Sequence, residues 1–131
     1  MSEMVTEITQ GIKISVQSVY ESAHSRPKQG YYVFSYRISI ENKSNMTVQL
    51  MRRHWYIFDS IAGWNEVEGE GVVSQQPTLY PEDEYQYESF CPLISEAGKM
   101  FGTYLMQNKV DGTTFEVRIP EFQLIAPYRF N

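Results

Sequence analysis

Hydrophobic and polar residues alternate with a period of two over much of the chain. From Ile12, through Ile14 to Val16, every second side chain is apolar, and polar side chains fill the positions between them. The longest alternation runs from 32 to 41, where the even positions are aromatic or branched aliphatic. Because successive side chains of a strand point to opposite faces, these patterns predict strands over 12–22 and 32–41, each with one buried face.

The segment 46–60 breaks this alternation. Val48 and Leu50 share one parity, whereas Trp55 and Ile57 share the other, which indicates a β-bulge near Arg52. Further strands are expected in the acidic segment 61–71 and over 85–90, 99–108 and 113–120, and no segment has the period of a long helix. Seven or eight short antiparallel strands predict an all-β sandwich, with a closed barrel as the alternative.

Composition and charge narrow the class of protein. The 131 residues suit one domain, 1–131, that can bury a core without cross-links. Ten Tyr, seven Phe and two Trp predict an aromatic core, and a single Cys91 excludes an internal disulfide. A net charge of -5 argues against binding nucleic acid or anionic lipid, and no apolar run is long enough to cross a membrane. The first ten residues lack the pattern of a secretion signal, so we expect a cytoplasmic protein.

Residues 69–77, GEGVVSQQP, look like the beginning of a phosphate-binding loop, with Ser74 in place of a third glycine. Such a loop needs a helix whose first amides meet the phosphate, but Val72 and Val73 are β-branched and glutamates precede them. A bend in a strand is therefore the favoured interpretation. The alternative is a pyrophosphate or nucleotide site formed by Gly69, Gly71 and Ser74, with counter-charges from Arg52, Arg53 or Lys28.

Residues that could support catalysis or bind a metal are few. A nucleophilic Cys91 would need an oriented base, and the only histidines are His24 and His54. These two histidines, without paired cysteines, do not form a metal-binding pattern. The carboxylates at 82–84 diverge along an extended segment and predict a solvated turn. The sequence therefore predicts no catalytic residue, no metal site and no cofactor.

Two aromatic segments are candidates for binding another protein. In 52–58, Arg, Trp and Tyr are residue types that dominate interface energetics. Trp55 and Ile57 are nevertheless expected to pack inside, with Arg53 and His54 either at the sheet surface or satisfying buried acceptors. Past Pro127, two more aromatic residues form a tail. The expected partner is an unidentified protein bound at an open strand edge, a loop or the tail, and self-association stays open. The candidate partner-binding residues are Arg53, Trp64, Tyr128 and Phe130.

Four segments resemble the ApaG family in order and spacing: LMRRHWYIFDSIAGWNEVEGEGVV, QQPTLYPEDEYQYES, GKMFGTYLMQN and FEVRIPEFQLIAP. The resemblance implies a fibronectin type III or immunoglobulin-like sandwich and a family without an established reaction. It also implies a genetic link to cobalt and magnesium resistance. We therefore expect a noncatalytic protein-interaction module. The chain departs from the family at Ser74, where a third glycine is common, and at Pro81-Glu82, where a proline-glycine turn is common.

Overall fold

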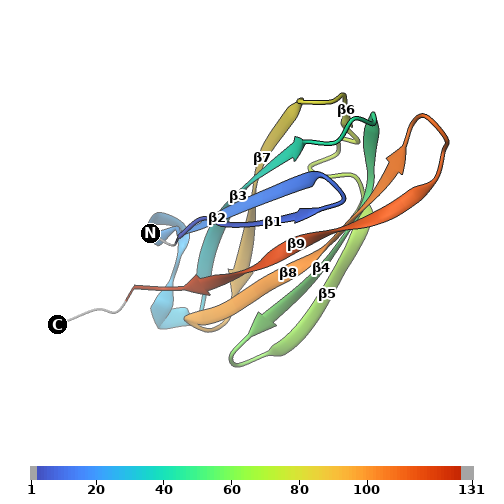
Figure 1. The fold of residues 1–131 in the computed structure, drawn as a ribbon. Coiled ribbons are helices and arrows are strands. Elements are labelled where there is room, and N and C mark those ends of the chain that lie inside the picture. The colour runs from blue at the N-terminus through green and yellow to red at the C-terminus, as the bar shows by residue number, and fades with distance from the viewer. Residues whose placement is uncertain (1–2, 128–131) are drawn as a thin grey trace.

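The computed structural model describes residues 3–127, which fold into nine β-strands and two short 3₁₀ turns (Figure 1). The 3₁₀ turns, η1 (Ser22–His24) and η2 (Pro27–Gln29), lie in the loop between the second and third strands. No helix within 3–127 is long and apolar enough to span a membrane. The strands are β1 (Val5–Thr9), β2 (Ile12–Tyr20), β3 (Tyr32–Asn42), β4 (Val48–Asp59), β5 (Gly63–Glu70), β6 (Thr78–Leu79), β7 (Glu84–Leu93), β8 (Ala97–Asn108) and β9 (Thr114–Ile125).

Two antiparallel sheets form the predicted sandwich, which is all-β and of the immunoglobulin or fibronectin type III kind. One sheet has the order β1-β2-β3-β7, and the other has the order β5-β4-β8-β9, with β6 paired to the start of β4. On one side the sheets join where β1 and β2 pack against β9, and the Ser18 hydroxyl donates to the Gln123 carbonyl at 2.8 Å (Figure 1). On the other side, β5 and β7 are edge strands, so the sandwich is open there.

The core lies between the sheets and is rich in aromatic side chains. Trp55 is 3% exposed and packs edge-to-face on Tyr36, with ring centroids 5.4 Å apart. Its indole also contacts the rings of Tyr104 and Phe122 at steep angles, an arrangement that aromatic quadrupoles favour. Ile57 packs against this cluster while partly buried, which confirms the inward orientation predicted for both residues.

The change of parity in β4 is caused by the predicted bulge. Pairing between β4 and β8 shifts between Leu50 and Arg52, so Met51 is the extra residue. A second shift lies between β8 and β9, and it falls at Pro120 of β9. A proline cannot donate to a ladder and is tolerated at such an irregularity, so β9 continues to Ile125 instead of ending at 120 as the sequence predicts.

The structure has nine strands, whereas the sequence predicts seven or eight. The N-terminal strand β1 was not expected, because its side chains are only half-buried on one face and its alternation is weak. A tight turn with positive φ at Gln10 and Gly11 returns the chain from β1 into β2. The other extra element, β6, has two residues and is too short to leave a periodic pattern.

Candidate functional site

The open side of the sandwich contains a cleft of about 730 Å³ between β5 and β7. This volume lies within the usual range for binding sites, roughly 300–1,000 Å³. Tyr36, Trp55 and Met100 line it from the core, and Val67 of β5 and Leu93 of β7 line its two walls. The cleft is therefore a mainly apolar surface that the two sheets leave uncovered.

Arg53 lies on the inward face of β4, where the cleft meets the loop after β5. Of its two predicted positions, the structure has the one in which Arg53 satisfies acceptors, and not the one at the outer sheet surface. Its Nη1 donates to the carbonyls of Glu70 and Gly71, at 3.0 Å each. A Cβ on Gly69 would lie 2.9 Å from this Nη1, so the missing side chain of Gly69 makes room for the guanidinium. The inward position is possible because these carbonyls accept hydrogen bonds from the partly buried charge.

Gly71 begins a tight hairpin that folds back on the bulge of β4. Its N–H donates to the Met51 carbonyl at 2.9 Å, and Val72 and Gln75 exchange two backbone hydrogen bonds of 2.8 Å. The central residues, Val73 and Ser74, have φ of 46° and 66°, as a primed two-residue turn requires. The described chain thus forms a turn after β5 and no helix, which confirms the predicted bend.

The residues predicted for phosphate binding are near one another, but their contacts are internal. Gly69 accommodates Arg53, and Nη1 of the Arg53 guanidinium donates to two backbone carbonyls. Ser74 has a positive φ, which glycine adopts without steric cost, so a third glycine at this position would suit the turn without any phosphate. Arg52 is exposed on the opposite face of β4. Phosphate binding stays a prediction that this geometry does not favour.

Val73 stores backbone strain at the rim of the cleft, because a β-branched residue rarely adopts φ of 46°. We expect Val73→Asn to raise the free energy of unfolding by about 1 kcal/mol, since asparagine tolerates the left-handed region. Urea unfolding measures the change. Val110→Asn is the control, because Val110 is 70% exposed and has no positive φ. Equal changes in both variants would contradict the assignment of strain.

Three ionisable side chains that line the cleft, Tyr36, Tyr87 and Cys91, are held in their neutral forms. Burial raises the pKa of Tyr36, and it raises the pKa of Tyr87 even further, despite a hydrogen bond between the Tyr87 and Tyr104 hydroxyls. Burial also raises the pKa of the Cys91 thiol to about 11. A thiol that stays protonated at neutral pH is a poor nucleophile. The cleft is consequently suited to binding and lacks an activated nucleophile among these residues.

The edge of β5 beside the cleft has unpaired backbone groups. In the antiparallel β4–β5 ladder, every second residue of β5 exchanges backbone hydrogen bonds with β4. Because the Gly71 N–H donates to the Met51 carbonyl, the odd-numbered residues of β5 are the ones that bond to β4. By this phase, the N–H and C=O of Trp64, Glu66 and Glu68 point to the open side. The two glutamate side chains are 61% and 53% exposed, so the free edge is acidic.

Among the predicted partner-binding residues, Trp64 is on the surface. It is 57% exposed on the outer face of β5 and contacts the rings of Phe58 and Phe101, with the Lys99 ammonium 5.8 Å from its ring. Arg53 faces the cleft, as described above. Tyr128 and Phe130 lie outside the described residues.

Sequence reasoning missed the contribution of Val67 and of β7 to the cleft. Neither Val67 nor Tyr87 has an unusual sequence context, and only the order of strands in the sheets brings them to the same opening. The row of glutamates in 66–70 does indicate an exposed face or a charged edge strand, but it does not indicate that a cleft lies beside this strand.

These observations define an immunoglobulin or fibronectin type III-like sandwich with an open, apolar side. The model of the ApaG domain matches residues 22–108. Protein ApaG of Brucella canis is 44% identical over 124 residues, 95% of each chain, and Protein ApaG of Paramagnetospirillum magneticum is 43% identical over 125 residues, again 95% of each. A crystal structure described as the putative ApaA protein from Bordetella pertussis has a TM-score of 0.85 and 41% identity, covering 90% of this chain and 95% of that one. The chain belongs to the ApaG family, as its sequence segments indicated.

Proposed function

We propose that this protein is a noncatalytic interaction module that binds an extended segment of a partner protein along the free edge of β5. The observation that supports this most is an unpaired strand edge with an apolar cleft directly beside it. Strand addition provides main-chain hydrogen bonds, and pockets for alternate side chains provide specificity. Both parts are present on the open side of the sandwich.

The shape and charge of this side define the chemistry of the bound segment. A strand paired with β5 would direct alternate side chains into the cleft, beside Val67, and the others to the outer face. The side chains of the bound segment that enter the cleft should be apolar, because the cleft is mainly apolar. The outward ones should be basic, because they would lie beside Glu66, Glu68 and the exposed ring of Trp64.

The same glutamates act against pairing between two copies of β5. Antiparallel pairing of two such edges would bring carboxylates close to carboxylates, which is destabilising. The proposed binding therefore involves a different, basic partner and needs neither a cofactor nor self-association. We place the interaction in the cytoplasm, and the association of the family with cobalt and magnesium resistance would then act through the partner.

A proline in the edge strand tests strand addition. We expect Glu66→Pro to weaken binding of the peptide acetyl-Lys-Val-Lys-Val-Lys-Val-Lys-amide at least about tenfold, because it removes an N–H that points to the open edge. Glu66→Ala is the matched control, since it loses the same carboxylate but keeps the N–H. Its expected effect is only about two- to fivefold. Titration calorimetry measures the peptide affinity of each variant, after its NMR spectrum has shown that it is folded.

Two outcomes would contradict the proposal. One is equal peptide affinity of the proline and alanine variants, which would mean that the backbone N–H groups of the β5 edge do not bind the peptide. The other is equally tight binding of an alternating Glu-Val peptide, which would remove the role of the acidic face. A Lys-Ser peptide should bind more weakly than the Lys-Val peptide, because serine cannot fill the apolar cleft.

A further inference from the structure

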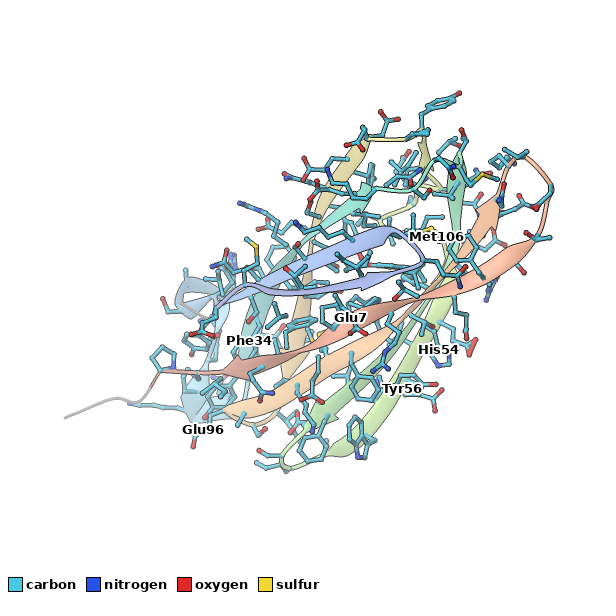
Figure 2. All side chains as sticks on the ribbon, viewed as in Figure 1. Glu7, Phe34, His54, Tyr56, Glu96 and Met106 are labelled. Carbon is cyan, nitrogen blue, oxygen red and sulfur yellow. The ribbon has the colours of Figure 1, made fainter. Side chains whose placement is uncertain are left out.

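A histidine and two glutamates meet on the outer face of the β4–β5 ladder, on the side away from the core. His54 Nε2 lies 2.9 Å from Glu66 Oε2, and His54 Nδ1 lies 3.4 Å from Glu68 Oε1. One ligand atom from each of the three residues lies within 4.8 Å of the others. Figure 2 shows His54 beside Tyr56 on this face, where the two rings stack with centroids 4.5 Å apart. The stacking restricts the orientation of the imidazole.

This arrangement has an excess of hydrogen-bond acceptors. A neutral imidazole has one N–H and one nitrogen lone pair, so it can donate to only one of the two carboxylates. The remaining nitrogen lone pair then faces the carboxylate of the other glutamate. With the imidazole in this neutral form, the cluster combines two negative charges with a lone pair, and these groups repel one another. A divalent cation among them would reverse that repulsion.

We propose that His54, Glu66 and Glu68 bind one divalent transition-metal ion of the zinc class. One imidazole nitrogen and two carboxylate oxygens are a donor set that suits Zn²⁺, with water completing a four-coordinate site. Donors bound to one zinc ion lie about 3.3 Å apart, so ligand atoms that lie within 4.8 Å of one another need to approach by up to about 1.5 Å. The Cα atoms of the three residues are held in place by the paired backbones of β4 and β5.

The neighbourhood leaves room for the ion and its water. A hollow of about 130 Å³ lies beside the cluster, and its polar lining consists of His54, Glu68, Thr103 and Glu116 together with Arg52 and Arg53. Glu116 adds a third carboxylate to this hollow. The hard cation Mg²⁺ is a poorer match, because it prefers oxygen ligands in an octahedral arrangement, whereas one of the three ligands here is an imidazole nitrogen.

Zinc titration of the full chain tests the site. We expect one equivalent of ZnCl₂ to shift the NMR signals of the His54 ring and of the amides in β4 and β5, with no comparable effect from the same concentration of MgCl₂. His54→Gln and Glu68→Gln should each weaken zinc affinity by at least about tenfold. His24→Gln is the control for adventitious binding to a surface histidine, and Glu121→Gln is the control for loss of an exposed carboxylate on another strand. Both controls should bind like the parent protein.

Three results would overturn the site: no zinc binding up to millimolar concentration, unchanged affinity in His54→Gln, or loss of binding in His24→Gln. The first would mean that the three side chains form a hydrogen-bonded surface cluster and not a metal site. Peptide binding at the β5 edge is measured without zinc, so the failure of either idea leaves the other standing. If both hold, zinc should weaken binding of the Lys-Val peptide, because it neutralises the same two carboxylates.

Discussion

Replacing Gly71 with alanine is expected to lower the free energy of unfolding by about 3–4 kcal/mol. Two causes add. Gly71 has φ of 63°, a conformation that costs alanine about 1 kcal/mol, and the new Cβ would lie 2.1 Å from the Gln75 carbonyl oxygen. That contact cannot be relieved by rotating a side chain, so the hairpin must move away from the β4 bulge. Urea unfolding followed by tryptophan fluorescence measures the loss.

Gly112→Ala separates the two causes. Gly112 has φ of 76°, yet nothing lies within 4 Å of the position its Cβ would take. We expect this variant to lose only about 1 kcal/mol, the cost of the conformation alone. Equal losses at Gly71 and Gly112 would show that the contact with Gln75 has no role, and that the packing of the loop after β5 is looser than described.

Asp59→Asn is expected to destabilise the protein by about 3 kcal/mol at neutral pH. The buried Asp59 carboxylate accepts from the N–H groups of Ile61 and Ala62, at 2.9 and 3.2 Å, and from that of Ile94, at 2.7 Å. It thus joins the β4–β5 turn to the β7–β8 loop at one end of the cleft. An asparagine amide would direct its NH₂ group at one of these donors and leave that N–H unsatisfied.

The effect of Asp59 should depend on pH in a defined direction. Burial acts to raise the pKa of Asp59, but the backbone donors outweigh it and hold the pKa below the usual value. A folded-state pKa below the unfolded value of about 3.9 stabilises the fold above that pH, and the stabilisation is lost as the pH falls through the folded-state pKa. The difference between the parent and Asp59→Asn should therefore shrink below about pH 4. A difference that stays constant from pH 7 to pH 2.5 would contradict this.

The period of two predicted most of the fold because most strands bury one face. The alternation over 12–22 and 32–41 corresponds to β2 and β3, and the phase change in 46–60 located the bulge to within one residue. β1 escaped prediction because it lies at an edge, where a half-buried strand needs no strict alternation. The alternation of apolar and polar residues thus predicts a strand only where one face of that strand is buried.

The candidate site was harder to predict because it depends on which strands are neighbours. The sequence leaves two positions open for Arg53, at the sheet surface or on buried acceptors, because it does not show that Gly69 lies opposite and that two carbonyls are within reach of the guanidinium. His54 and Glu68 are 14 positions apart, and only the pairing of β4 with β5 brings them together. A hairpin turn recognised between Asp59 and Gly63 would have placed them opposite each other.

Amide hydrogen exchange of β5, with and without saturating Lys-Val peptide, is the most direct test of binding at the open edge. The N–H groups of Trp64, Glu66 and Glu68 face solvent in the free protein, whereas those of Asn65 and Val67 already bond to β4. We expect the peptide to slow exchange at 64, 66 and 68 and to change 65 and 67 little. Unchanged exchange at these three amides, or protection confined to β7, would contradict strand addition to β5.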